Sequence, residues 1–521
     1  MLRPIRIPAL LTLLAGAALF AFGVVDGPRL QSSRDQGQSL AVDVFRELVQ
    51  IDTTEERGTA GAVAAVAARF RAAGFPDSDI HVVGPSERKQ NLVVRLRATA
   101  PTRRPLLLLA HADVVEARRE DWSVEPFRFL ERDGHYYGRG TTDMKDIAAC
   151  WTSTLIELKK AGSPLARDII FALTADEEGG DSNGVEWLVR NRRDLVDAEY
   201  CLNEGGGGQI HDGRYAVYNV QAAEKVYLSF RLEARDSGGH SALPKRENPI
   251  YRLASALGRL GSHQFPARLN EVTREYFNRM SRIETGEVAK DMDTVARASD
   301  ETSSLRLDPE RGALAPSRRA APRLPPSAED AIRRLSRLPY YNALVRTTCT
   351  ATMLEGGHAE NALPQMARAV VNCRLLPEDS PQEVQRTLAE VIGDPGVSVT
   401  ALGKDDRGPA SPLLPEVIAA VEGVAREMWP GVPVVPVMAT GATDGRILRR
   451  EGIPTYGLGA FENIEDNRAH GADERIGVKQ FREELEFLSR VVRAVSSPAP
   501  SRPAPYPPAT TASRPSRPER P

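Results

Sequence analysis

Five separated segments of the chain carry side chains of the types that bind divalent cations. They are HAD at residues 111–113, TTDMK at 141–145, DEEGG at 176–180, NEGG at 203–206 and AHGADE at 469–474. Each alone is weak evidence, because a carboxylate at the end of a strand is more often solvated or a helix cap. Their joint occurrence favours a metal site, and histidine and carboxylate ligands without a thiolate suit zinc, with cobalt or manganese as substitutes.

Three of these segments directly follow a predicted strand. His111 follows the apolar run 106–110, the DEEGG segment follows the run 168–174, and Glu204 follows the run 198–202. The carboxyl ends of parallel strands meet at one edge of an open α/β sheet, where ligands bind. The four glycines that begin at Gly205 are interpreted as space beside Glu204, since the Lys-Ser/Thr ending of a phosphate loop is missing.

The elements that must position these residues begin with a strand, a crossover helix and a strand, which indicate an α/β domain. The runs 106–110 and 168–174 lack alternation, as expected for strands buried on both faces of a sheet. The remaining predictions for this part are helices at 39–51, 59–73 and 143–161 and a strand at 91–97.

Between residues 225 and 403 the pattern resembles an inserted β-α-β-β-α-β unit. The predicted strands are 226–234, 346–353, 367–375 and 397–402, and the predicted helices start near Pro249 and at Pro381. The polar stretch 284–327 is expected to be a loose excursion that could hold a short helix. The chain then returns to the first sheet with a helix at 415–428 and strands at 434–438 and 455–458.

Composition and the chain ends bound the function. Of the 521 residues, 68 are basic and 70 acidic, so no global field predicts a binder of nucleic acid or anionic membranes. Arg3 and Arg6 precede an apolar run at 7–25, which is typical of an export signal. We expect a periplasmic or secreted protein, with an uncleaved membrane anchor as the alternative. The Pro-rich stretch 496–521 is expected to be a solvated tail.

The four cysteines are too sparse for a disulfide framework in so long a chain. Cys150 and Cys201 are expected to be buried and free. Cys349 and Cys373 both lie in predicted strands of the inserted unit, and they could pair in an oxidising compartment.

In chain order, the five motifs resemble those of the zinc metallopeptidase family of carboxypeptidase G, succinyl-diaminopimelate desuccinylase, aminoacylase and yeast carboxypeptidase S. The resemblance covers about residues 40–495. It implies an α/β catalytic domain, with a mixed sheet flanked by helices, and an inserted α+β ferredoxin-like lid of the dimerisation type. The implied domains are a signal or anchor with its linker at 1–38, the catalytic domain at 39–224 and 404–495, the lid at 225–403 and a disordered tail at 496–521.

The resemblance also implies roles for the motif residues. Two zinc ions per subunit would share Asp143, and the remaining ligands would be His111 and Glu204 for the first ion and Glu178 and His470 for the second. Asp113 would hydrogen-bond the His111 imidazole and fix its tautomer. Glu177 would be the general base.

The charges of this ligand set suit hydrolysis. Three ligand carboxylates do not neutralise two divalent cations, and the remaining positive charge would stabilise a bridging hydroxide and polarise a carbonyl. Glu177, outside the ligand set, could pass the proton of the water to the leaving amine. Glu177 and Glu178 would point to opposite faces of a strand, so both reach the site only if Gly179-Gly180 bends the chain.

The lid carries three further candidates. The GGHS segment matches the family motif whose histidine, here His240, often reaches a neighbouring subunit and steadies the oxyanion. Asn361 and Arg374 match the family's lid residues, and Arg374 could grip a substrate carboxylate bidentately. The alternatives are that His240 only caps its loop and that Arg374 forms a structural ion pair.

The sequence leaves two roles undecided, that of the GATDGR turn and that of a long segment of the lid. Asp444 and Arg446, in the GATDGR turn, could contact substrate or form a structural pair. The segment 261–340 is longer than in compact relatives and closer to carboxypeptidase S, and it could block a homodimer surface on the lid.

The leading hypothesis is an exported dizinc hydrolase, a carboxypeptidase or N-acyl amino acid hydrolase. It would act on a small peptide or N-acyl amino acid, cleaving the amide bond next to a free carboxylate. The alternatives are a dipeptidase of the same fold and a non-catalytic relative that binds amino-acid-like ligands.

Overall fold

The computed structural model describes residues 28–298 and 324–498, with side chains from Gly37 onward. The expected export signal at 7–25 and nearly all of the expected tail at 496–521 lie outside the described residues. Within them, no helix is long and apolar enough to cross a membrane.

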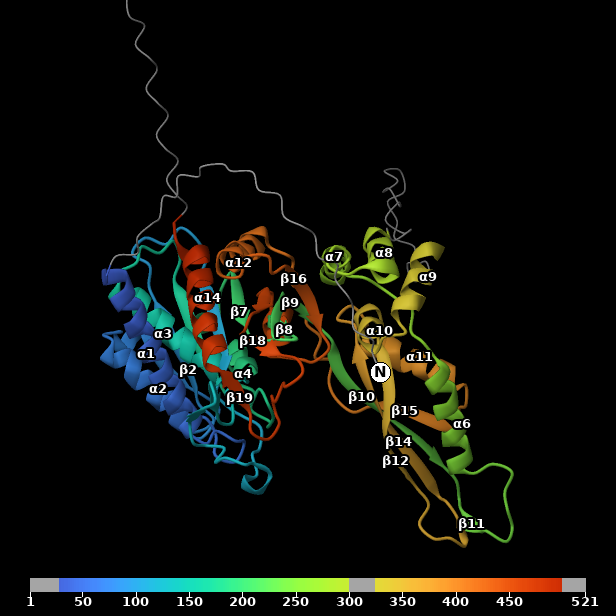
Figure 1. Ribbon diagram of the computed structural model, residues 1–521. Coiled ribbons are helices and arrows are strands. Elements are labelled where there is room, and N and C mark those ends of the chain that lie inside the picture. Colours follow the sequence, from blue (N-terminus) through green and yellow to red (C-terminus); the bar gives the residue numbers. More distant parts are fainter. Residues whose placement is uncertain (1–27, 299–323, 499–521) are drawn as a thin grey trace, which may run out of the picture.

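A ten-stranded mixed sheet forms the centre of the main body (Figure 1). Its path is β1-β2-β6-β3-β7-β17-β9-β8-β18, and β16 pairs with β9. Strands β3, β6, β7 and β17 are parallel, whereas β2 is antiparallel to β6. The bounds are β1 (Ile80–Val83), β2 (Asn91–Leu96), β3 (Leu106–His111), β6 (Ile169–Thr174), β7 (Tyr200–Asn203), β8 (Gly207–His211), β9 (Arg214–Glu224), β16 (Val434–Ala439), β17 (Thr455–Gly457) and β18 (Phe461–Asn463).

Helices cover both faces of this sheet. One face carries α1 (Pro28–Gln50), α2 (Ala60–Ala72), α3 (Lys145–Lys160), α12 (Pro415–Met428) and α14 (Val478–Ser496), and the other carries α4 (Gly184–Asn191), α5 (Arg193–Val196) and α13 (Gly445–Arg450). Along β3, Leu106 and Leu108 join the first core, while Leu107 and Leu109 join the second. The expected strand buried on both faces and the mixed α/β fold are therefore confirmed.

A four-stranded antiparallel sheet forms an arm that extends from the main body (Figure 1). The arm sheet contains β10 (Val226–Arg235), β12 (Thr348–Gly356), β14 (Met366–Leu375) and β15 (Val397–Ala401), and one face is covered by α6 (Pro249–Ser262) and α11 (Pro381–Ile392). Its spatial order is β12-β14-β10-β15, and its chain order is strand, helix, two strands, helix, strand. This is the expected β-α-β-β-α-β connectivity.

In the described part of the chain between α6 and β12 there are four more helices, namely α7 (Glu271–Met280), α8 (Gly286–Arg297), α9 (Pro326–Leu335) and α10 (Pro339–Val345). The described part of the expected loose excursion is more ordered than predicted, because α8 buries Met292 and Val295. Helix α7 reaches the main body, where Arg279 donates to the backbone carbonyl of Val434 at 2.8 Å. These helices therefore connect the arm to the edge of the main sheet.

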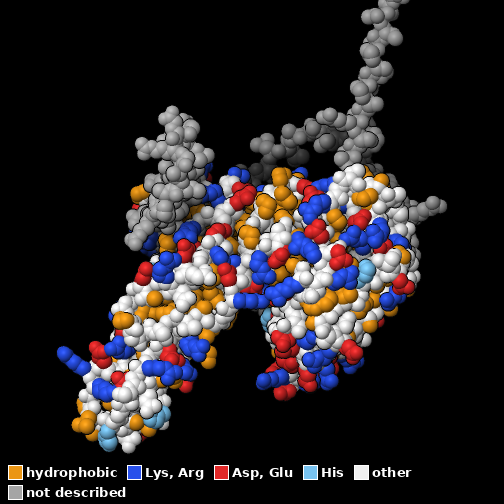
Figure 2. All heavy atoms as spheres, turned by 180° about the vertical axis from the view of Figure 1, so that it is seen from behind, with side chains coloured by type: hydrophobic (Ala, Val, Ile, Leu, Met, Phe, Trp, Pro, Cys, Tyr) orange, Lys and Arg blue, Asp and Glu red, His pale blue; other side chains and the backbone are white. Residues whose placement is uncertain are grey.

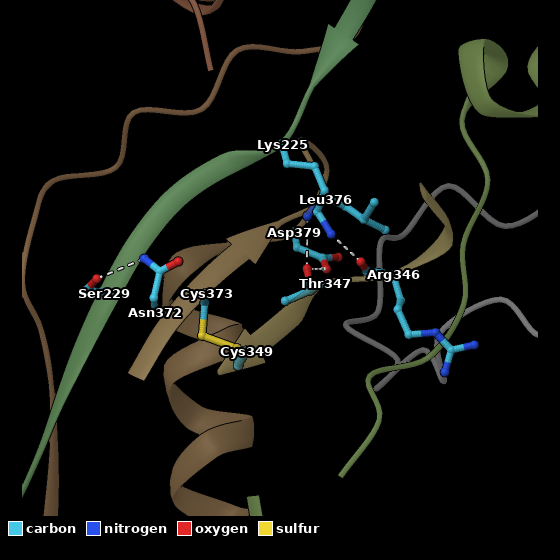
Figure 3. The surroundings of a disulfide bond; sticks show 9 residues. All are labelled: Lys225, Ser229, Arg346, Thr347, Cys349, Asn372, Cys373, Leu376 and Asp379. Atoms are coloured by element: carbon cyan, nitrogen blue, oxygen red, sulfur yellow. Dashed lines mark hydrogen bonds between the residues drawn. A yellow bond between two sulfur atoms is a disulfide. The ribbon is translucent and has the colours of Figure 1, made fainter. Parts of the chain in front are cut away.

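The cysteines behave as expected. A disulfide joins Cys349 of β12 to Cys373 of β14, whereas Cys150 and Cys201 are buried and free. Figure 3 shows the disulfide beside Asn372, which donates a hydrogen bond to Ser229 on β10 at 3.1 Å. The disulfide thus fixes the outermost strand of the arm sheet to its neighbour.

Candidate metal centre

His111 is the last residue of β3, and its imidazole is buried. Its Nδ1 donates to the backbone carbonyl of Asp113 at 2.9 Å. Because a carbonyl can only accept, this hydrogen bond leaves the Nε2 lone pair as the free ligand position. Nε2 lies 3.0 Å from Asp143 Oδ1 and 3.7 Å from Glu204 Oε1. These groups are acceptors that repel one another unless a proton or a metal cation lies between them.

Asp113 contributes differently from the sequence-based expectation. Its backbone, not its carboxylate, holds the His111 imidazole, since Asp113 Oδ1 is 3.8 Å from Nδ1. The carboxylate instead accepts a hydrogen bond from the backbone N–H of Glu178 at 2.9 Å. Asp113 therefore joins the end of β3 to the segment that carries Glu177 and Glu178.

Asp143 lies between the two histidines. Its Oδ1 is 3.0 Å from His111 Nε2, and its Oδ2 is 2.9 Å from His470 Nε2. Burial opposes ionisation of Asp143, but His111 and His470 in their protonated forms, which donate to its two oxygens, outweigh burial and hold its pKa below the usual range. One carboxylate with an imidazole on each oxygen is the arrangement that a bridging ligand needs.

His470 and Glu178 complete the second half of the cluster. His470 Nε2 is 2.8 Å from Glu178 Oε1, and the side chain of His470 is 52% exposed. Hydrogen bonds to Asp143 and Glu178 raise the pKa of His470 to about 10. The negative charge of Asp143 and Glu178 around His470 therefore favours a bound cation.

Glu474 is a positioning residue that sequence reasoning did not assign, although it ends the AHGADE motif. It is fully buried and accepts from the backbone N–H of Gly140 at 3.0 Å and of Thr142 at 2.8 Å. Arg139 donates to the same carboxylate at 2.6 Å. Glu474 thus joins the loop before Asp143 to the loop that carries His470. The His470 loop continues into β19 (Arg475–Gly477), which forms a small sheet with β4 (Leu130–Arg132) and β5 (His135–Tyr137).

The chain bends so that both adjacent glutamates reach the cluster. Asp176 has a left-handed φ of 57°, and Gly180 has a φ of 101°. The bend therefore begins before Glu177, earlier than the expected Gly179-Gly180 position. Burial, with the negative charge of Asp444, raises the pKa of Glu177 to about 8.

The donor set fits a metal-binding site. Two groups of side chains each bring their candidate ligand atoms within 4.8 Å of one another. The first group is His111, Asp143 and Glu178, and the second is His111, Glu177 and Glu204. Burial also raises the pKa of Glu204 well above its usual value. Carboxylates so crowded in a buried place require compensating positive charge. Since Glu177 falls in the second group, its role outside the ligand set stays a prediction.

His240 and Asn361 lie together at the far end of the arm, in the short strands β11 (Gly239–His240) and β13 (Ala362–Leu363) or beside them (Figure 1). The backbone N–H of Ser241 donates to the carbonyl of Asn361 at 3.1 Å. Both side chains are exposed, and no described contact joins either to the metal centre of the same chain. His240 Nδ1 accepts from the backbone N–H of Ala242 at 3.0 Å, so it does cap its own loop.

Arg374 lies at the opposite end of the arm, next to the main body. Its Nη1 points to the carbonyl oxygen of Thr440 at 3.5 Å, and its guanidinium lies 4.8 Å from the ring centre of Tyr227. Among the described residues, no carboxylate forms an ion pair with it. Figure 2 shows open space between the arm and the main body, where a substrate could approach.

The GATDGR turn lies beside both Arg374 and the metal centre. Asp444 is buried and accepts from Asn183 Nδ2 at 2.6 Å, whereas Arg446 pairs with Asp406 at 2.7 Å. Asp444 and Arg446 are therefore held by different partners, not by each other. Burial raises the pKa of Asp444 to about 6.

Comparisons with known proteins point to one family. Residues 107–494 match the model of Peptidase family M20/M25/M40. The chain is 27% identical over 412 residues to N-fatty-acyl-amino acid synthase/hydrolase PM20D1 of Homo sapiens, covering 76% of this chain and 75% of that protein. It is 27% identical over 323 residues to carboxypeptidase S of Saccharomyces cerevisiae, covering 60% and 52%.

Solved structures show the same fold at lower identity. The M20 family metallo-carboxypeptidase Sso-CP2 from Sulfolobus solfataricus has a TM-score of 0.61 and 18% identity, with 87% of this chain and 99% of that chain covered. Human carnosine dipeptidase 1 has a TM-score of 0.55 and 17% identity, with 89% and 98% covered.

Proposed function

The chain belongs to Peptidase family M20/M25/M40, and on this premise we propose that it is a dizinc hydrolase that cleaves a peptide or N-acyl amide bond beside a free carboxylate. The family membership makes it a metallopeptidase or amidohydrolase. The observation that carries the finer proposal is the position of Asp143, whose two oxygens face His111 and His470 at 3.0 and 2.9 Å.

In this proposal each residue of the cluster has a separate role. Asp143 would be shared by both cations, with His111 and Glu204 as further ligands of one and His470 and Glu178 as further ligands of the other. When bound, the cations supply the positive field that activates a water and polarises the scissile carbonyl. The hydrogen bond to the Asp113 carbonyl orients His111, and Glu474 keeps the loops of Asp143 and His470 together.

Glu177 is the proposed general base. Its carboxylate would take a proton from the attacking water and give it to the leaving nitrogen, which departs as an amine. A carboxylate beside the cluster that would hold no cation is free to accept a proton and to release it again.

Arg374 is the proposed contact for the substrate carboxylate. Its guanidinium is partly exposed, lacks a carboxylate partner among the described residues and reaches the turn that leads to Asp444. Planar guanidinium groups bind carboxylates through two parallel hydrogen bonds. The names of the relatives, an N-fatty-acyl-amino acid hydrolase and a carboxypeptidase, support substrates with a free carboxylate.

A homodimer and export complete the proposal. Strand β12 is one of the two edge strands of the arm sheet, with Met353 67% and Leu354 72% exposed. Such an edge can pair with a second copy of the chain. In that arrangement His240, which is exposed at the far end of the arm, would be available to the second copy. Arg3, Arg6 and the apolar run 7–25 support export to the periplasm or the medium, either free or anchored by that run.

A panel of substrates tests this function. It contains N-acyl amino acids with short and long acyl chains, dipeptides, and the C-terminal amide of each compound. We expect turnover of one class of free acids and much weaker turnover of the matched amides. Preference for dipeptides over N-acyl amino acids would favour a dipeptidase. No turnover of any compound by protein with bound zinc would favour a binding protein instead.

A further inference from the structure

Tyr227 has a large aromatic side chain that the core of the arm does not use. It is the second residue of β10, and 55% of it is exposed, whereas its neighbours Val226 and Leu228 are buried. The register of the arm sheet places Tyr227 directly opposite Arg374 on β14. The exposed phenol and the guanidinium therefore share the uncovered face of the sheet.

The ring of Tyr227 is itself held in place. Asn372 Nδ2 donates to Ser229 Oγ at 3.1 Å, and Ser229 Oγ donates to the phenol oxygen of Tyr227 at 3.4 Å. Ser229 lies two residues from Tyr227, so it points to the same face of β10. Figure 3 shows the Asn372 and Ser229 end of this chain of contacts beside the disulfide.

Arg374 depends on the ring of Tyr227, because few other contacts fix its guanidinium group. Its guanidinium carbon lies 4.8 Å from the ring centre of Tyr227, within the range of a cation–π interaction. Its only other described contact is the long approach to the carbonyl of Thr440 at 3.5 Å. An arginine side chain has many rotamers, and a ring beneath it removes most of them without satisfying its N–H donors.

We propose that Tyr227 is a positioning residue that sets selectivity for a free substrate carboxylate by holding Arg374 in its binding orientation. The inference rests on the proposed function, in which Arg374 binds that carboxylate. The ring leaves the N–H edge of the guanidinium free for a bidentate contact, whereas an acidic partner would compete with the substrate. Tyr227 therefore favours the acid over the amide without contacting the reacting bond.

The test compares Tyr227→Leu with Tyr227→Phe on one N-acyl amino acid and its amide. Leucine removes the cation–π interaction, so KM for the acid should rise about 3- to 30-fold. The kcat value and the KM for the amide should stay unchanged. Phenylalanine keeps the ring and should restore most of the wild-type KM. Tyr251→Leu is the matched control, because Tyr251 is 62% exposed on α6 and outside this network.

The double variant Tyr227→Leu/Arg374→Ala separates the positioning role of Tyr227 from the carboxylate contact of Arg374. If Tyr227 acts through Arg374, the double variant should match Arg374→Ala in its KM for the acid. An equal rise of KM for acid and amide in Tyr227→Leu would overturn the inference, as would wild-type KM values in that variant. If Arg374→Ala leaves the ratio of acid to amide hydrolysis unchanged, the proposed carboxylate contact itself fails.

Discussion

Lys89 Nζ donates to Oδ1 of Asp176, the residue directly before Glu177, and the two side chains are only 7% and 1% exposed. Asp176 is the residue whose left-handed backbone starts the bend toward the metal centre. Lys89 comes from the loop before β2, 87 residues earlier in the chain. The orientation of the proposed general base therefore depends on a buried ion pair formed with a distant loop.

Replacing Lys89 by methionine should destabilise the protein strongly. The substitution leaves the Asp176 carboxylate buried and unpaired, which costs about 3–5 kcal/mol of the free energy of unfolding. Denaturant unfolding measures this loss. Lys404→Met is the control, because the pair of Lys404 with Glu186 is at the surface and should cost less than about 1 kcal/mol. The double variant Lys89→Met/Asp176→Asn should recover part of the loss, and equal stability of both single variants would contradict this account.

Glu177→Gln should separate catalysis from metal binding. Glutamine has nearly the same shape but cannot accept the proton of the water, so kcat should fall about 100- to 10,000-fold. Elemental analysis should find the same metal content as in the wild type. Glu178→Gln is the comparison, and it should lose metal as well as activity. Retained turnover in Glu177→Gln would remove Glu177 from the role of base.

Lys225, at the junction of β9 and β10, should make stability depend on pH. Its Nζ donates to the carbonyls of Ala343 and Arg346, and burial lowers its pKa to about 7. The unfolded chain, with a lysine pKa near 10.5, binds more protons than the native state between these values. Stability from this residue therefore rises with pH across that window, by up to about 1.4 kcal/mol per pH unit.

The comparison with Lys225→Met isolates this effect. Denaturant unfolding of both proteins at several pH values from 7 to 9 gives the difference in free energy of unfolding. We expect the wild type to gain stability relative to the variant as the pH rises. A difference that is constant or falls with pH would show that Lys225 is charged in the native state.

The disulfide should be detectable by counting thiols. Denatured, unreduced protein should react at Cys150 and Cys201 only, and reduction should expose two more thiols. The linked residues are 24 positions apart, so Cys349→Ser/Cys373→Ser should lower the free energy of unfolding by about 3 kcal/mol. Four reactive thiols before reduction would contradict the cross-link.

The sequence predicted the elements whose burial is uniform or strictly periodic. The helix at 415–428 has the expected bounds, and α11 starts at Pro381 as expected. Strands β3 and β6 were recognisable because both of their faces are covered. Strand β8 was missed because its glycines looked like a loop. Gly208 lies in a strand against the ring of Phe461, where a Cβ atom would come within 2.2 Å of the ring.

The site was only partly accessible to sequence reasoning. The five motifs were expected to converge on one metal site, and His111, Asp143 and His470 do. The link from Lys89 to Asp176 could not be predicted, because two charges so far apart in sequence leave no local pattern. The contact of Tyr227 with Arg374 depends on the register of two strands that are far apart in the sequence, and no short turn between them specifies that register.

The metal content of active protein tests the central claim most directly. Protein purified without added metal would be analysed for zinc, cobalt and manganese per chain, and its turnover followed during removal of metal by a chelator. The proposed centre requires two cations per chain and a loss of turnover that parallels their removal. Full turnover by protein with only traces of metal, unchanged by the chelator, would contradict it.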